Sequence, residues 1–256
     1  MIGIRVRLSM AAAAAAMLTV ALCGCGEAIH NSAEDDHYIR TGSSSDAPIP
    51  EIVASPNARL LPTQIGSRWV GHMTARKIDP SATADASEQA GTDVTTVVAQ
   101  KMLPDGVPGY VVETRQSTQT KPYRVEVYTS DARGVGLTSI SGQNQSMALS
   151  SPLPLIQTPT RLGDVLSWQG FVQMATGRLP AKAYSRVSAQ SILSLPAGKI
   201  GAYRVDTILQ VQDGSRLVGI PMTRWFAPGI GIVERRFFVG EMTIDDQLVS
   251  YHPARG

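Results

Sequence analysis

Four histidines are the side chains best suited to acid–base chemistry near neutral pH, and no nucleophile motif accompanies any of them. They are His30, His37, His72 and His252. His72 falls in a predicted strand, where we expect a hydrogen-bonded structural histidine rather than a general base. The sequence contains no Gly-x-Ser-x-Gly, no His-Glu-x-x-His, no phosphate-binding loop and no dinucleotide fingerprint. We therefore assign no catalytic residue, metal ligand or cofactor, and we predict that the protein is not an enzyme.

Carboxylates are the second group that could carry chemistry, because a glycosidase needs two facing carboxyl groups roughly 5–10 Å apart. The acids that fall on predicted strands are Glu113, Glu126, Asp206 and Glu234. Their spacing does not mark any two of them as a pair. We expect them to be solvated cross-strand partners of strand arginines, namely Arg115, Arg124, Arg204 and Arg235. A hydrolase is therefore the least favoured function.

Large aromatic side chains are the remaining candidates for a site. They are Trp69, Trp168, Trp225, Phe226, Phe237 and Phe238. Such residues could line a groove for an apolar, lipid-like or sugar ligand, although aromatic residues more often fill a core. Phe237 and Phe238 are neighbours on a predicted strand and must point to opposite faces, so one of them is expected at the surface or under a second layer.

The first 24 residues read as an export signal. Arg5 and Arg7 precede an apolar, alanine-rich run at 11–22, which is too short to span a membrane. The following Leu22-Cys23-Gly24-Cys25 resembles the lipobox of bacterial lipoproteins, and this resemblance implies cleavage before Cys25 and acylation of its sulfur. The membrane would then be a partner through this anchor, and Gly26 at the next position implies the outer membrane in a Gram-negative host. An ordinary secretory signal with a stray cysteine pair is the alternative.

Charge and cysteine content limit the mature chain further. Both cysteines, Cys23 and Cys25, lie at the predicted cleavage site, so the body can form no disulfide within itself. Without Arg5 and Arg7 the chain has 21 basic and 21 acidic residues and no dense basic run. Nucleic-acid binding is therefore not expected, and no basic run assists the lipid anchor. Residues 25–60, rich in Ser, Pro and acids, are expected to form a disordered tether.

The body shows the period of two that is typical of strands with one buried and one wet face. In one run Tyr203, Val205, Thr207, Leu209 and Val211 alternate with polar residues, Ile208 being the exception. Tyr123, Val125 and Val127 alternate with Arg124 and Glu126. We predict an all-β fold of antiparallel meander sheets, half-barrel or sandwich-like, with about a dozen strands.

Turn signals separate the predicted strands. We expect hairpin turns at Pro104-Asp-Gly106, Asp213-Gly214, Pro228-Gly229 and Asp245-Asp246. The segment Gln143–Leu149 fits a strand or a short helix, and Asp79–Gly91 reads as a long mobile loop.

A repeated motif indicates an internal duplication. Pro62-Thr-Gln-Ile-Gly66 is echoed by Pro159-Thr-Arg-Leu-Gly163, and each copy is followed by a tryptophan with a glycine two residues later, Trp69 with Gly71 and Trp168 with Gly170. The period suits two similar meander units, which we place at 61–150 and 151–256. Chance similarity between glycine-containing turns is the alternative.

The segment from Trp225 to Gly231, Trp-Phe-Ala-Pro-Gly-Ile-Gly, resembles a Trp-Tyr-Ala-Pro-Gly-Val-Gly-like motif of uncharacterised secreted bacterial β-proteins and lipoproteins. This resemblance implies an extracytoplasmic β-sheet fold and transfers no active site. We predict a lipid-anchored cell-envelope protein that binds an apolar or lipid-like ligand on a curved sheet. A protein–protein scaffold of an envelope assembly is the alternative.

Overall fold

The computed structural model describes residues 59–77, 89–142, 146–239 and 242–254, all within one compact unit that spans Ile52–Gly256. These residues contain twelve strands and no helix. The strands are β1 (Arg68–Lys77), β2 (Gln89–Met102), β3 (Pro108–Gln116), β4 (Arg124–Asp131), β5 (Gly134–Gly142), β6 (Ser146–Gln157), β7 (Val165–Met174), β8 (Gly177–Leu195), β9 (Gly198–Asp213), β10 (Arg216–Ala227), β11 (Gly231–Val239) and β12 (Met242–His252). Cys25 and the predicted export signal lie outside the described residues.

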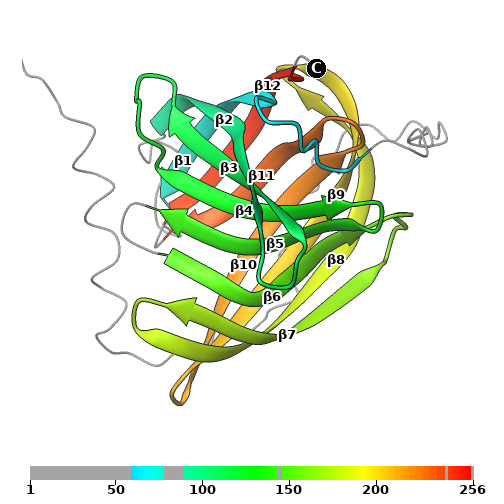
Figure 1. The fold of residues 1–256 in the computed structure, drawn as a ribbon. Coiled ribbons are helices and arrows are strands. Elements are labelled where there is room, and N and C mark those ends of the chain that lie inside the picture. Colours follow the sequence, from blue (N-terminus) through cyan, green and yellow to red (C-terminus); the bar gives the residue numbers. More distant parts are fainter. Residues whose placement is uncertain (1–58, 78–88, 143–145, 240–241, 255–256) are drawn as a thin grey trace, which may run out of the picture. The chain divides into compact units, whose positions relative to one another are not determined.

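Each strand pairs antiparallel with the next one along the chain, and β1 pairs with β12, so that the meander closes into a barrel. The predicted all-β antiparallel meander is confirmed, and its sheet closes on itself rather than remaining a half-barrel. Figure 1 shows the green strands β3–β6 on one wall, opposite the orange and red strands β10–β12. Side chains that point inward from these two walls can therefore meet across the lumen.

Three of the four predicted hairpin turns are found where one strand ends and the next begins. In the turn between β10 and β11 the Ile230 amide donates to the Ala227 carbonyl at 3.1 Å, and Gly229 has a φ of 78°. A positive φ at the third residue of the turn, directly after Pro228, is the geometry of a type II turn, which glycine adopts without strain. The turns at Asp105-Gly106 and Asp213-Gly214 also lie between paired strands, as predicted.

Two boundary predictions were wrong. Asp245 and Asp246 do not turn a hairpin but lie inside β12, where they pair in register with Arg236 and Arg235 of β11. The predicted loop Asp79–Gly91 is too long at its end, because β2 already begins at Gln89; residues 78–88 lie outside the description. For Gln143–Leu149 the strand alternative is correct from Ser146 onward, since β6 begins there.

Alternation along β9 is as predicted, with Tyr203, Val205, Thr207, Leu209 and Val211 all buried. At the start of β4 the burial is the opposite of the prediction. Arg124 and Glu126, expected in solvent, are buried, whereas Tyr123 and Val125 are only half-buried. The inner face of β4 is thus polar at these two positions, and its burial is explained by charged partners on other strands.

The two copies of the glycine motif have matching backbone bonds. The Gly66 amide donates to the Val97 carbonyl at 2.8 Å, and the Gly163 amide donates to the Val187 carbonyl at 2.8 Å. Both acceptors sit at a register irregularity, Val97 in the β2–β3 pairing and Val187 in the β8–β9 pairing. These positions are six strands apart. The duplication stays a prediction, and its proposed boundary at residue 150 falls within β6.

The seam between β6 and β7 has few backbone pairs. Strands β6 and β7 share only two registered pairs, Ala148 with Gln173 and Leu149 with Val172. Side chains of β6 supplement them, since Ser150 accepts a bond from the Phe171 amide and Ser151 accepts one from the Trp168 indole. By contrast, β1 and β12 share ten pairs. In the part of the chain that is described, no helix is long and apolar enough to cross a membrane.

Candidate functional site

Charged side chains from three strands meet inside the barrel. Glu126 on β4, with 1% of its surface exposed, accepts hydrogen bonds from three arginines. Arg124 of the same strand donates at 2.7 Å, while Arg224 of β10 and Arg235 of β11 each donate at 3.2 Å. Because β10 and β11 are not sheet neighbours of β4, the last two bonds cross the lumen.

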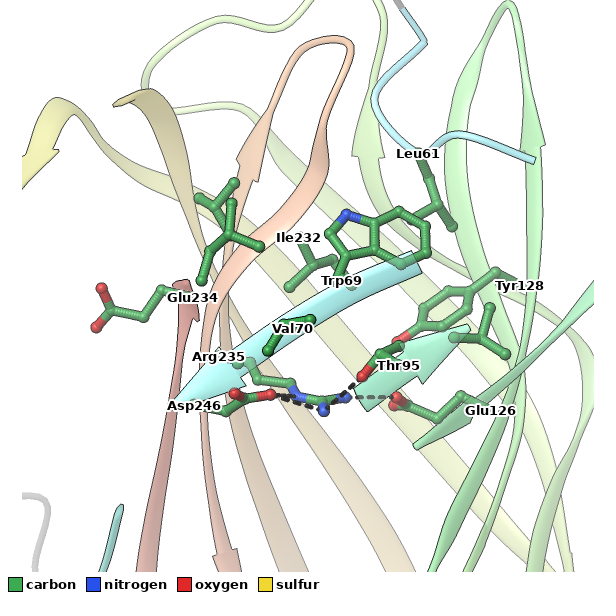
Figure 2. Close-up of a pocket in the computed structure, with 14 residues that line it drawn as sticks. Leu61, Trp69, Val70, Thr95, Glu126, Tyr128, Ile232, Glu234, Arg235 and Asp246 are labelled. Carbon is green, nitrogen blue, oxygen red and sulfur yellow. Dashed lines mark hydrogen bonds and ion pairs between the residues drawn. The ribbon is translucent and has the colours of Figure 1, made fainter. Parts of the chain in front are cut away.

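Arg235 joins this cluster to the next strand. Its guanidinium bonds to the Asp246 carboxylate on β12 at 2.8 Å and donates to the Thr95 and Thr114 hydroxyls at 3.4 and 3.3 Å. Figure 2 shows the guanidinium between Asp246 on one side and Glu126 on the other. We call the set Arg124, Glu126, Arg224, Arg235 and Asp246 the interior charge cluster.

A glycine makes room for this arrangement. A Cβ added at Gly71 of β1 would overlap with the Oδ1 atom of the Asp246 carboxylate. The register of β1 on β12 also shifts between Val70 and Gly71. The glycine of the predicted Trp69-Val-Gly71 motif therefore leaves space for a charged side chain from the neighbouring strand.

The arginines of the cluster keep the Glu126 carboxylate ionised. Burial by itself would raise the pKa of Glu126, but the charges of Arg124, Arg224 and Arg235 outweigh it and hold the pKa well below its ordinary value. Such a carboxylate neither donates nor takes up a proton near neutral pH. Glu126 therefore does not provide a general acid or base.

A second buried carboxylate has the opposite tendency. Burial raises the pKa of Asp93 on β2 from 3.8 to about 6, and nearby Asp246 adds to this effect. The hydrogen bond from the Tyr123 hydroxyl and the charge of Arg235 oppose it. Asp93 thus titrates closer to neutral pH than an exposed aspartate would.

A cavity of about 40 Å³ lies beside the cluster. Trp69, Leu61 and Ile232 line it on one side, and Glu126, Arg235 and Asp246 lie on the other (Figure 2). Two buried polar atoms at this cavity have no hydrogen-bond partner among the described groups, the Tyr128 hydroxyl and Asp246 Oδ1. The unpartnered polar atoms and this volume suit water rather than an acyl chain, since ligand pockets usually measure roughly 300–1,000 Å³.

Of the aromatic residues predicted for a site, Trp69 lines the cavity. Its indole donates to the Ile230 carbonyl at 2.7 Å and its ring stacks on Tyr251 with centroids 5.3 Å apart. Trp168 is buried elsewhere, with its indole donating to Ser151 at 2.9 Å. Trp225 is buried beside Arg204, whose guanidinium carbon lies 5.6 Å from its ring centroid.

The three phenylalanines differ in their burial. Phe226 is fully buried in the core. Phe237 is half-buried under Arg124, whose guanidinium carbon lies 4.3 Å from its ring centroid. Phe238 points the other way and is 43% exposed, so one member of the pair is at the surface, as strand alternation requires.

The expectation that strand acids and arginines are solvated pairs is correct for Asp206 and Arg204, which are both partly exposed at 3.1 Å. It was wrong for Glu126, Arg124 and Arg235. Glu234 is also buried, although its carboxylate points away from the cluster (Figure 2).

Sequence reasoning missed Arg224 and Asp246 as members of a buried site. One signal was available for Arg224, because it shares strand parity with the apolar Met222 and Phe226. A charge on an apolar face indicates a buried partner. The partner itself, 98 residues away on another wall, has no sequence signal.

Two kinds of site, a metal site and a histidine general base, have no clear counterpart among the described residues. Among the described residues no group of three or more His, Cys, Asp or Glu side chains could hold a metal ion. His72 is exposed on β1 and is not among the residues that line the cavity.

No family model matches the sequence, and no curated protein matches it either. Three solved structures are similar. A protein described as exported, with a YmcC-like fold, from Bacteroides fragilis has 15% identity and a TM-score of 0.46, with 76% of this chain and 99% of that chain covered. A protein described as a lipoprotein from Parabacteroides distasonis has 10% identity and a TM-score of 0.37, with 76% and 99% covered. The hypothetical lipoprotein YmcC from Escherichia coli has 7% identity and a TM-score of 0.32, with 72% and 85% covered.

Proposed function

We propose that this chain is a lipid-anchored protein of the bacterial cell envelope that acts by binding and not by catalysis. Support for the anchor comes from the export signal and from the lipobox-like frame that ends at Cys25. Support for a non-catalytic role comes from Glu126, whose three arginine partners keep it ionised and shielded. The residue after the acylated cysteine is Gly26, so the outer membrane is the destination in a Gram-negative host.

The observation that carries the binding mode is the set of ion pairs across the lumen. The interior charge cluster ties β4 to β10 and β11 across the barrel, and the cavity beside it measures about 40 Å³. A cavity of this volume is far smaller than a site for a lipid. We therefore favour the docking of an envelope component on the outside of the barrel over the capture of a ligand inside it.

An apolar or lipid-like ligand remains the second candidate because one side of the cavity is lined as such a site would be. Trp69, Leu61 and Ile232 gather there with Val112 and Val233. Native mass spectrometry of the purified protein decides between the two candidates. Outer-wall docking predicts a bare mass in the absence of a partner, whereas a lipid adduct at one equivalent would establish interior binding.

The anchor has its own test. Mass spectrometry of the mature N-terminal peptide should show Cys25 as the first residue, carrying acyl chains, and Cys25→Ser should release the protein from the membrane fraction. Gly26→Asp should keep an acylated protein in the inner membrane of a Gram-negative host. A mature terminus elsewhere, or a Cys25 without acyl chains, would disprove lipid anchoring.

A further inference from the structure

Charge is distributed unevenly along a mature chain that is neutral as a whole. Residues 165–223, which form β7 to most of β10, hold six basic and two acidic side chains, a net charge of +4. The rest of the mature chain is correspondingly acidic. Such asymmetry between segments is a mark of interaction with an anionic partner. These positive residues form no dense basic run because they are spread over three strands, β8, β9 and β10.

Strand register gathers these charges on the outer wall. In β8 the residues Ala181, Ala183 and Ser185 are buried, while Lys182 and Tyr184 between them are exposed. Lys182 therefore points outward, away from the lumen. Its neighbours on β7 and β9 are glutamines, Gln169 and Gln210, so no carboxylate faces it across the strands.

Exposed apolar side chains accompany the charges. Tyr184 is 44% exposed and pairs in register with Ile208 of β9, which pairs with Pro221 of β10. Further along the same wall, Phe171 of β7 is exposed and the Arg178 guanidinium carbon of β8 lies 4.0 Å from its ring centroid. The wall thus presents aromatic, aliphatic and cationic groups together.

One acid of the segment is already engaged by side-chain hydrogen bonds, and the other lies opposite an arginine in the strand register. Asp206 accepts bonds from Arg204 at 3.1 Å and Thr223 at 2.8 Å, and Asp213 pairs in register with Arg216. The positive charges of Arg178 and Lys182 therefore remain uncompensated by these acids. We call the outward side of β7, β8, β9 and β10 the basic–apolar wall.

We propose that the basic–apolar wall docks on the anionic surface of a lipid membrane. Each basic residue near such a surface contributes about 1 kcal/mol of attraction, and tyrosine with aliphatic neighbours favours the headgroup region. This inference rests on the proposed envelope location and names the component to which the barrel docks. An acylated Cys25 would hold the wall close to that surface, and docking would then be an intramolecular step.

The test uses residues 25–256 with Cys25→Ser, which retain every described residue and lack the anchor. The probes are phosphatidylcholine vesicles with and without phosphatidylglycerol, and binding is measured by co-sedimentation. We expect binding to the anionic vesicles, weakened by added salt and much lower on pure phosphatidylcholine. Lys182→Glu should lower the partition coefficient roughly ten-fold, and Tyr184→Ser should lower it at unchanged salt dependence.

Lys101→Glu is the matched control, because Lys101 is exposed on β2, away from the wall. This substitution changes the net charge of the protein by the same amount as Lys182→Glu. It should change the partition coefficient less than about two-fold. An equal loss in this control, equal binding to both kinds of vesicle, or no vesicle binding would overturn the proposal. So would self-association that Tyr184→Ser abolishes in sedimentation velocity, since a second copy would then cover the wall. None of these outcomes bears on acylation of Cys25, which mass spectrometry tests separately.

Discussion

Arg224 and Glu126 are 98 residues apart in the sequence, and the Arg224 guanidinium donates to the Glu126 carboxylate at 3.2 Å across the lumen of the barrel. The bond joins β10 to β4, two strands that share no backbone ladder. It lies in a buried, low-dielectric environment, in which removing one member of an ion pair leaves the remaining charges poorly compensated. The stability of the barrel should therefore be sensitive to each member of the interior charge cluster.

Glu126→Gln should lower the free energy of unfolding by about 3–5 kcal/mol, because it leaves three buried arginines facing a neutral amide. Urea unfolding monitored by circular dichroism measures the change. Asp131→Asn serves as the comparison, since Asp131 pairs with the exposed Arg133 in a hairpin. That replacement should change stability little. Similar effects of the two substitutions would show that the cross-lumen pairs are not structurally important.

Gly71→Ala should destabilise the barrel by about 1–3 kcal/mol, because the added methyl group takes the space of the Asp246 carboxylate. The displaced carboxylate would no longer hold Arg235. Gly91→Ala is the matched variant, since a Cβ at Gly91 on β2 meets Met73 at an ordinary 3.6 Å. Thermal unfolding of both variants measures the difference. A Gly71→Ala protein as stable as Gly91→Ala would contradict the close approach of β12 to β1.

Asp93 should make the protein less stable as the pH rises toward neutral. Its pKa is about 6 in the folded chain and 3.8 without burial, so the folded state holds the proton more tightly. This contribution is complete below about pH 3.8 and is lost as the pH rises through 6, at a cost of up to about 3 kcal/mol. Glu126, whose pKa is lowered, acts in the opposite sense, and its contribution is lost only as the pH falls below its ordinary value.

Asp93→Asn isolates the first of these effects. The variant should show a flatter dependence of unfolding free energy on pH between about 4.5 and 7. Urea denaturation at several pH values measures both proteins. If the two curves run parallel, Asp93 does not carry the raised pKa.

The β6–β7 seam should open before the other seams. Only two registered pairs join these strands, whereas β9 is paired along its length to both β8 and β10. Amides at 165–171 that face β6 should therefore exchange with deuterium faster than amides at 201–211. Exchange followed by mass spectrometry of peptides tests this. Equal protection of the two segments would show that the side-chain bonds of Ser150 and Ser151 close the seam fully.

Local chemistry was enough to predict the strand-rich character of the chain and three of its hairpin turns. Alternation along β9 and the Pro228-Gly229 pair depend on side-chain parity and on backbone φ, both of which are properties of a few adjacent residues. The error at Asp245-Asp246 has a physical reason. Two acids resemble a turn by composition, but here each faces an arginine of β11, and the cross-strand charge pairs keep the segment extended.

The sequence by itself predicted the all-β meander, which the structure confirms, and an export signal, which stays a prediction. It also contains no recognisable catalytic motif. Each of these features depends on short stretches of chain. Only the tertiary structure decided that the sheet closes and that Glu126 faces inward with Arg224 and Arg235. Pairing of β8, β9 and β10 in register decided that positive charges on separate strands share one outer wall. The bonds of Glu126 join residues roughly a hundred positions apart, for which period and composition contain no information.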